Sequence, residues 1–390
     1  MNPLNPFFAV IIFLIAFLTG YIIKLKYKIN PQNGRYETID GVRGFLALGV
    51  FIHHSSAWYQ SFQLGFWEPL KSNLYEQFGK TTVSLFFMIT SFLFISKLLN
   101  TGNKEFNWRN FFISRIFRLA PMYYFSVWLI IIILICIGLW PEKIGMSEFL
   151  GSVINWCFFR IHLIHNSSST EAASFFINLG VDWSLSYEWL FYFSLPLISI
   201  LILKIKPKIG FIILSVIFIV IFYEIHDVVV YHIYSFIGGA VAAFLLKFTS
   251  LYKKIKDIYS SIIILICLFL IVQFNTAYNI YCQLLISIVF TFLALGASFL
   301  GLLKNSTLKF LGEISYSTYL LHAILLFTVF RFGFGLDRMY YMTPLQYCFI
   351  IFSITPILVL VSFLGFKFIE KPSIDKAKTI VRKLDAKSVR

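Results

Sequence analysis

Long apolar segments separated by short charged ones recur along the 390-residue chain and limit it to one fold class. Most of them have the roughly 17–25 residues that an α-helix needs to cross the hydrocarbon core of a bilayer. Helices of this kind satisfy their own backbone polar groups inside lipid. The sequence therefore predicts an all-α, polytopic integral membrane protein with eleven transmembrane helices, at about residues 6–24, 43–60, 81–100, 119–140, 184–203, 209–223, 229–247, 258–273, 279–302, 315–331 and 346–366.

Composition supports the same class. The chain is 59% hydrophobic and only 13% charged, whereas soluble domains are about 45–50% apolar and about 25% charged. This excludes a water-soluble globular protein and a disordered one. Five cysteines without a CxxC spacing indicate neither a disulfide framework nor a zinc site. The apolar stretch 148–161 is too short to span and is predicted to be an interfacial helix.

The distribution of charge predicts how the chain is oriented. Lys and Arg number 33 against 18 acidic residues, a net charge of +15. If the first helix runs from outside to inside, 27 of the 33 basic residues fall in inner segments, as the positive-inside rule requires. We therefore expect the N-terminus outside and the C-terminus inside, and no nucleic-acid partner. The expected domains are an N-terminal helix with a basic linker (1–35), a membrane domain (36–373) and a basic cytoplasmic tail (374–390).

The second predicted helix carries an unusual pair of ionisable groups. Arg43 and His54 are 11 residues apart, just over three helical turns, so they share one face with His54 about 16 Å further along the axis. His53 faces elsewhere, and Asp40 precedes the expected helix and can cap it. Ionisable groups at membrane depth usually mark function. The alternative is a snorkelling arginine and a histidine bonded to a neighbouring helix.

Two further sites combine charge with apolar surroundings. Arg115 and Arg118 are an i,i+3 pair whose guanidinium groups can converge on one anion such as a phosphate. The alternative is ordinary basic flanking of a cytoplasmic helix end. Asp182 starts the fifth helix, and Glu188 lies about 9 Å deeper, near the expected depth of His54. A His and a Glu at one depth can act as general base and orienting or proton-accepting partner. The alternative is a structural Glu bonded across helices.

Other histidines give weaker indications. His322 on the tenth helix suits either an interhelical hydrogen bond or a role in a cavity. His162 and His165 lie in the longest outer loop, and without a set of carboxylates or cysteines around them no metal site is expected.

Six motifs in order resemble the acyltransferase-3 family of integral membrane acyltransferases, which includes bacterial O-acetyltransferases of surface polysaccharides. They cover about residues 36–373: IDGVRGFLALGVFIHH, VSLFFMITSFLF (83–94), Arg115-Ile-Phe-Arg118, WSLSYE (183–188), ISYSTYLLH (314–322) and Glu370-Lys-Pro. The Arg–His spacing of the first motif selects His54 over His53. The chain departs from the family pattern at Thr90-Ser91, in its additional first helix and in lacking a fused soluble domain.

The resemblance implies an O-acyltransferase. Its donor is an acyl-CoA such as acetyl-CoA, used as a cytoplasmic co-substrate, with no permanently bound cofactor. Its acceptor is a hydroxyl of an envelope glycan or lipid-linked saccharide, such as O-antigen or exopolysaccharide, in a bacterial inner membrane whose lipid is the other partner. The implied roles are donor binding for Arg43, Arg115 and Arg118, catalysis for His54 and Glu188, and substrate binding for Asp182, Trp183, Ser186 and His322.

Two other functions fit some of these residues. A proton-coupled transporter or flippase of a glycan or anion would use Arg43, His54 and Glu188 as a path through the membrane. Transporters usually show internal repeats and broken helices in matching halves, and the sequence shows neither. A non-catalytic scaffold or sensor would not need His54, the pair of Arg115 and Arg118, and Glu188 together. The acyltransferase is the prediction that the six motifs favour.

Overall fold

A computed structural model describes residues 2–31, 36–101, 106–139, 145–160, 169–203, 209–225, 229–248 and 256–388. Within these ranges the chain forms helices and the turns that join them, without a β-strand. The predicted all-α class is therefore confirmed. Contacts divide the chain into two compact units, and each unit consists of two separate stretches. Unit 1 comprises Met1–Lys97 and Val229–Ser362, and unit 2 comprises Leu98–Val228 and Phe363–Arg390.

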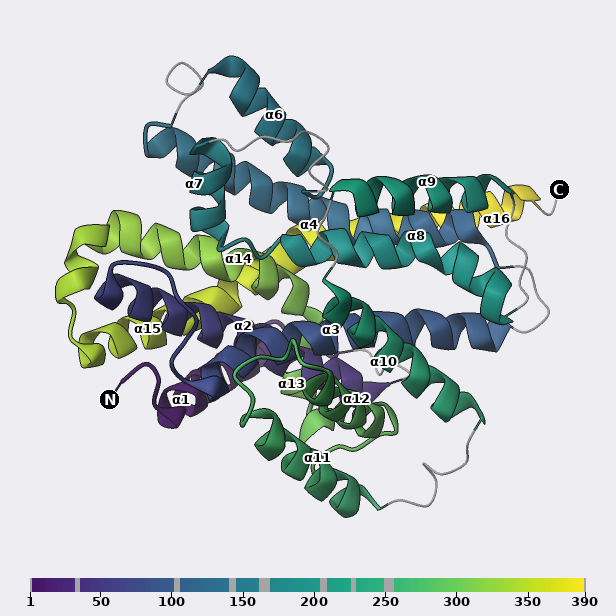
Figure 1. Ribbon diagram of the computed structural model, residues 1–390, viewed down its shortest axis with the longest axis horizontal. Coiled ribbons are helices and arrows are strands. Elements are labelled where there is room, and N and C mark those ends of the chain that lie inside the picture. The colour runs from purple at the N-terminus through teal and green to yellow at the C-terminus, as the bar shows by residue number, and fades with distance from the viewer. Residues whose placement is uncertain are drawn as a thin grey trace. The chain divides into compact units, whose positions relative to one another are not determined.

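Each unit contains its own set of helices (Figure 1). Unit 1 holds α1 (Pro6–Lys26), α2 (Glu37–Leu64), most of α3 (Asn73–Thr101), α10 (Val230–Phe248), α11 (Asp257–Ile271), α12 (Ile280–Ala294), η2 (Leu302–Lys304), α13 (Ser306–Glu313), α14 (Ser315–Thr328), η3 (Val329–Phe334), η4 (Leu336–Tyr341) and most of α15 (Pro344–Gly365). Unit 2 holds α4 (Trp108–Cys136), α6 (Met146–Cys157), α7 (Ser169–Asn178), α8 (Trp183–Leu203), α9 (Ile209–Ile225), η5 (Phe366–Glu370) and α16 (Lys371–Ser388).

Seven of the described helices are long and apolar enough to cross a membrane. They are α1, α3, α4, α8, α10, the segment Ser315–Phe334 and the continuous helix Pro344–Ala386, which joins α15, η5 and α16. Three shorter apolar helices, α9, α11 and α12, have 15–17 residues. Each of the eleven predicted segments overlaps a helix, but α2, where the sequence predicts a span at 43–60, is not among the seven.

Several helix ends differ from the predicted ones. Helix α2 starts at Glu37, so Asp40 lies inside its first turn and is not the residue that caps it. Helix α12 ends at Ala294, where the sequence predicts a helix to residue 302. The stretch predicted as an interfacial helix forms the shorter helix α6, whereas α7 and α13 are additional. His162 and His165 lie outside the described residues.

Glycines bring α2 and α13 into close backbone contact in unit 1 (Figure 1). A Cβ atom at Gly312 of α13 would lie 1.8 Å from the carbonyl oxygen of Asp40, and one at Gly41 would lie 1.9 Å from that of Leu303. Neither position can hold a side chain unless the backbone moves. Gly312 therefore allows the close crossing of α13 with α2, and Gly41, which lies in the first motif, allows the close contact of α2 with η2.

A carboxylate holds the turn that leads to this crossing. Asp257, the first residue of α11, accepts hydrogen bonds from the backbone N–H groups of Ser298 (2.6 Å) and Leu300 (2.8 Å) and from the Ser298 hydroxyl (2.9 Å). Partial burial acts in the opposite direction, but these bonds and nearby Lys304 hold the pKa of the Asp257 carboxyl below its ordinary value. The turn includes Leu300 at φ 57° and leads directly into η2, whose Leu303 lies against Gly41.

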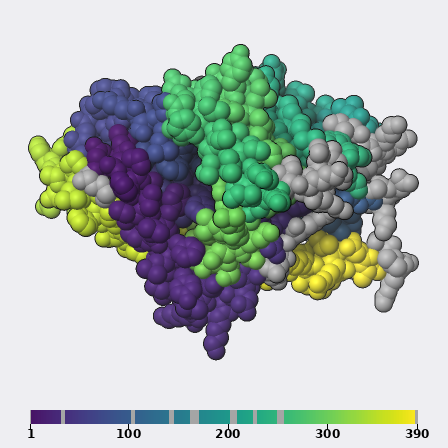
Figure 2. Space-filling view, turned by 90° about the horizontal axis from the view of Figure 1, so that it is seen from below, coloured from purple at the N-terminus to yellow at the C-terminus, as the bar shows by residue number. Residues whose placement is uncertain are grey.

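Helix α1 covers part of the outer surface of unit 1, as its purple atoms show in Figure 2. Its outward side chains are large and apolar, with Phe7, Leu14 and Leu18 between 59% and 70% exposed. A contiguous apolar surface of this kind is unfavourable in water and favourable in lipid. The helix surface therefore agrees with the membrane location that the sequence predicts.

Candidate functional site

A hydrogen-bonded pair of histidines is the most distinctive polar feature of unit 1. His54 on α2 and His322 on α14 approach with Nδ1 of His54 2.8 Å from Nε2 of His322. Their rings are nearly parallel, with centroids 5.1 Å apart. His322 is completely buried, and its Nδ1 lies 3.2 Å from the backbone carbonyl oxygen of Thr318, one helical turn earlier. The structure thus brings together two predicted site residues that are 268 positions apart.

The neighbouring histidine has a different environment. His53 places Nδ1 2.9 Å from the backbone carbonyl oxygen of Tyr75, and its ring packs against α3 at Gly79. A Cβ atom at Gly79 would lie 2.7 Å from that ring. His53 and His54 therefore occupy different sides of α2, as the sequence predicts, and His53 serves the contact between α2 and α3.

Arg43 belongs to the same uninterrupted helix as His54. Its side chain is half-buried, and its Cβ is 3.7 Å from the position that a Cβ would take at Gly312. Because α2 is continuous from Glu37 to Leu64, the 11-residue spacing puts Arg43 and His54 on one face of the helix. The shared face that the sequence predicts is therefore present.

Unit 2 contains a second polar cluster, which joins Glu188 to Arg115. The hydroxyl of Tyr192 donates a hydrogen bond to Oε1 of Glu188, one turn earlier on α8. The Tyr192 oxygen is also hydrogen-bonded to Arg115 of α4, which can only donate. Tyr192 is 1% exposed, whereas Glu188 is half-buried. A guanidinium, a phenol and a carboxylate thus form one hydrogen-bonded chain.

Arg118 contacts a different group. Its Nη2 nitrogen lies 3.2 Å from Oε1 of Glu370, whose side chain is fully buried, while the Arg118 side chain is 23% exposed. Glu370 is the last residue of η5 and the first residue of the closing Glu-Lys-Pro motif. Arg115 and Arg118 therefore engage separate protein groups in this structure, Tyr192 and Glu370, and an anion that binds both would have to share them with these partners.

The residues predicted at the start of α8 form a third cluster. Oδ2 of Asp182 lies 2.7 Å from Nε of Arg160, and both side chains are buried. The hydroxyl of Ser186 donates to the carbonyl oxygen of Phe159 at 2.9 Å, and Trp183 packs edge-on against Tyr187. These contacts fasten the segment after α6 to the first turns of α8.

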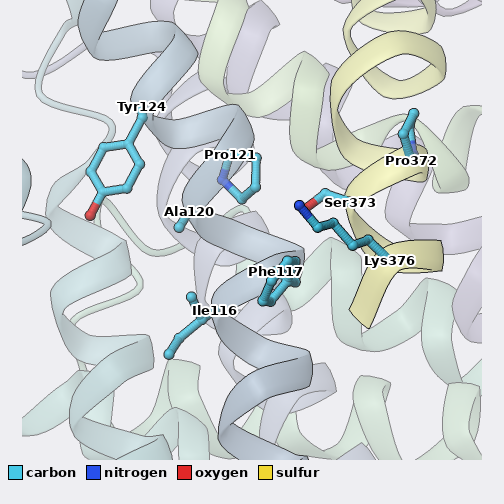
Figure 3. A pocket seen from close by; sticks show the side chains of 8 residues that line it. All are labelled: Ile116, Phe117, Ala120, Pro121, Tyr124, Pro372, Ser373 and Lys376. Carbon is cyan, nitrogen blue, oxygen red and sulfur yellow. The ribbon is translucent and has the colours of Figure 1, made fainter. Parts of the chain in front are cut away.

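A groove of about 440 Å³ lies between α4 and α16 in unit 2 (Figure 3). Helix α4 contributes Ile116, Phe117, Ala120, Pro121 and Tyr124, and α16 contributes Pro372, Ser373 and Lys376. Lys376 is the only charged lining residue, and in Figure 3 its side chain reaches from α16 toward α4. The predicted site residues are not among those that line this groove.

The sequence did not predict a role for two residues in these clusters, Tyr192 and Arg160. It identified Glu370 as part of the closing motif but did not predict that Glu370 pairs with Arg118. Tyr192 follows Glu188 by four positions, a spacing that puts both on one helix face and would have indicated the contact. The other two pairings join segments far apart in the chain or across a loop, which spacing does not reveal. Among the described residues no group of three His, Cys, Asp or Glu side chains is close enough together to hold a metal ion.

The apolar helices and the buried ionisable clusters define an integral membrane protein equipped for polar chemistry. Residues 36–363 match a family described as an acyltransferase domain, and the chain belongs to this acyltransferase-3 family. No curated protein and no solved structure matches the chain. The family assignment makes the protein a membrane acyltransferase and confirms the resemblance of its motifs.

Proposed function

We propose that the protein is a membrane O-acyltransferase that moves an acyl group, most simply acetyl, from acyl-CoA to a hydroxyl of an envelope glycan or lipid-linked saccharide in a bacterial inner membrane. The observation that carries this proposal is the hydrogen bond between His54 and His322. Acyl transfer to a hydroxyl needs a base that removes the hydroxyl proton as the oxygen attacks the thioester. The histidine pair supplies such a base between two apolar helices, α2 and α14.

The position of each proton follows from the hydrogen-bond chain. The Thr318 carbonyl can only accept, so His322 carries a proton on the Nδ1 that faces it. A neutral His322 then accepts at Nε2, so His54 donates from Nδ1. This leaves Nε2 of His54 with its lone pair. Neutral His54 therefore has the tautomer that a general base or an acyl-accepting nucleophile requires.

The proposed reaction uses this nitrogen directly. Nε2 of His54 takes the proton of the acceptor hydroxyl while the oxygen forms a bond to the thioester carbonyl carbon. The carbon–sulfur bond then breaks, and the leaving CoA thiolate takes up the proton from Nε2 of His54, which returns the histidine to its neutral form. Transient transfer of the acyl group to Nε2 is the other route. Glu188 orients the reacting groups or holds the released proton.

The donor end of the proposal rests on guanidinium groups. Arg43, Arg115 and Arg118 are assigned to the phosphates of CoA, because arginine keeps its charge and binds phosphate through two parallel hydrogen bonds. Their partially exposed side chains support the assignment. Asp182, Trp183, Ser186 and His322 were predicted to bind substrate; the ion pair of Asp182 and the contact of His322 favour supporting roles for these two.

Substitution of His54 by Asn tests the function. Asn places an amide N–H where Nδ1 stood and so keeps the donor to His322, but it lacks Nε2. We expect His54→Asn to abolish transfer of label from radiolabelled acetyl-CoA to saccharide in membrane vesicles. His53→Asn is the matched control, since it keeps a donor toward the Tyr75 carbonyl and should retain transfer.

Mass spectrometry of the envelope glycans, with and without the protein, would identify the acyl group and the modified sugar. Normal transfer by His54→Asn would refute the catalytic role of His54. Wild-type vesicles that transport a saccharide but transfer no label would favour a transporter.

A further inference from the structure

The hydrogen-bonded chain from Arg115 through Tyr192 to Glu188 joins two of the groups to which the proposed function gives roles. Tyr192 is buried on α8, and its hydroxyl is the only atom of its side chain that can form hydrogen bonds. That hydroxyl donates to Glu188 and is bonded to Arg115 at the same time. The single proton of the phenol therefore points to the carboxylate, and the oxygen lone pairs face the guanidinium.

This arrangement has a definite direction. Arg115 cannot accept a hydrogen bond and an ionised Glu188 cannot donate one. The Tyr192 hydroxyl therefore accepts from Arg115 and donates to Glu188, and each of these bonds polarises the O–H group so that the other is strengthened. Charge-assisted hydrogen bonds of this kind are stronger than neutral ones and fix the orientation of both ends. Burial excludes water that would otherwise replace the phenol.

We infer that Tyr192 is a positioning residue that couples Glu188 to Arg115, so that the orientation of the proton-handling carboxylate depends on the donor-binding guanidinium. The inference rests on the proposed function for the roles of these two groups. The buried hydroxyl of Tyr192 is engaged with these two groups, so it acts on the reaction through them. Its effect is to hold Glu188 in one orientation and to keep Arg115 extended toward α8.

Removal of the hydroxyl alone tests the inference. We expect Tyr192→Phe to lower the transfer rate from radiolabelled acetyl-CoA by about 10- to 100-fold, the size of effect associated with a hydrogen bond to a charged group. Tyr124→Phe is the matched control. It also removes one tyrosine hydroxyl from unit 2, a hydroxyl that donates to the Cys157 carbonyl at 2.8 Å, and it should leave transfer unchanged.

A double-mutant cycle separates coupling from packing. If Tyr192 acts through Glu188, adding Tyr192→Phe to Glu188→Gln should lower transfer by less than about twofold, whereas a packing defect would give the full, additive loss. Adding Tyr192→Phe to Arg115→Gln should likewise lower transfer by less than about twofold. Additive effects in both cycles, or normal transfer by Tyr192→Phe, would overturn the inference.

Melting temperatures in detergent give a readout that does not need turnover. The Tyr192→Phe and Glu188→Gln variants should each melt below the wild type, and the double variant should melt no lower than the less stable single variant. Wild-type vesicles without any transfer would refute the proposed function, and the melting cycle would still decide whether Tyr192 and Glu188 are coupled. Additive decreases in melting temperature would count against Tyr192.

Discussion

At the scale of single residues, one backbone carbonyl determines the chemistry proposed for His54. The oxygen of Thr318 orients the proton of His322, and His322 in turn orients the proton of His54. His322 was predicted as a substrate contact or as one end of an interhelical hydrogen bond, and the structure shows the bond. A histidine whose partner is another neutral histidine remains a base, because the partner contributes no positive charge.

Replacement of His322 should therefore impair the reaction without abolishing donor binding. We expect His322→Ala to lower the turnover number by about 10- to 100-fold, because His54 loses the acceptor that sets its tautomer. The KM for acetyl-CoA should change little. Steady-state kinetics on purified protein would measure both constants.

A conservative substitution provides the check on His322. The amide oxygen of Gln can accept from Nδ1 of His54, so His322→Gln should recover a substantial part of the turnover that His322→Ala loses. Equal turnover in the two variants would show that His322 fills space and does not orient His54.

Residue-scale prediction from sequence succeeded where one helix carries the whole pattern. The shared face of Arg43 and His54 and the divergence of His53 follow from the helical repeat alone. The pairs that form between different helices could not be predicted in this way. Neither Tyr192 with Arg115 nor Glu370 with Arg118 can be derived from spacing, because tertiary packing brings these pairs together.

At the scale of helices, the crossing of α2 and α13 depends on the absence of side chains. We expect Gly312→Ala to lower the free energy of unfolding by about 3 kcal/mol or more, the upper end for overpacked sites, because the obstructing Asp40 carbonyl belongs to the backbone and cannot rotate away. A lower melting temperature and a smaller folded fraction on size-exclusion chromatography would show this.

Another helical glycine offers a control for this substitution. Gly210 in α9 has no atom within 4 Å of a built Cβ. Gly210→Ala should leave the melting temperature unchanged or slightly higher, because alanine favours helix. Similar losses from both substitutions would mean that the crossing of α2 and α13 is not unusually close.

Helix existence was easier to predict than helix ends. Apolar length located a helix at each of the eleven segments, but it placed the start of α2 too late and the end of α12 too far along. The start of α2 is polar and packs against η2 and α13, so hydropathy does not include it in the helix. The chain after α12 turns at Gly296, φ 103°, and is held by Asp257, a contact that no local pattern shows.

At the scale of the whole molecule, orientation is the property that charge predicts most directly. We expect the C-terminus inside, because 27 of the 33 basic residues then face the cytoplasm. In a bacterial host, green fluorescent protein fused at the C-terminus should fluoresce, and alkaline phosphatase fused there should be inactive.

Fusions at internal positions would test the same orientation. A truncated fusion after Cys136 should show active phosphatase and no fluorescence, because the segment after α4 is predicted to lie outside. Active phosphatase at the C-terminus would reverse the predicted topology. Equal results at both sites would show that the number of spans between them is even.

The division into two units could not have been predicted from hydropathy. Each unit is assembled from two separate stretches of the chain, and two of the three boundaries between stretches fall inside α3 and α15. The apolar segments of the two units have similar hydropathy. Hydropathy therefore predicts which segments enter a membrane, but it does not predict which helices pack against each other.

The ion pair between Arg118 and Glu370 has a consequence for biogenesis. Glu370 leaves the ribosome 252 residues after Arg118, and at about 5–20 residues per second this interval is on the order of 10–50 s. Throughout that time the guanidinium must be accommodated by something other than its final partner, and the phosphates of the surrounding lipid are suited to that role. The second stretch of unit 2 is made only after the second stretch of unit 1, so unit 2 cannot be completed before the whole of unit 1 has been synthesised.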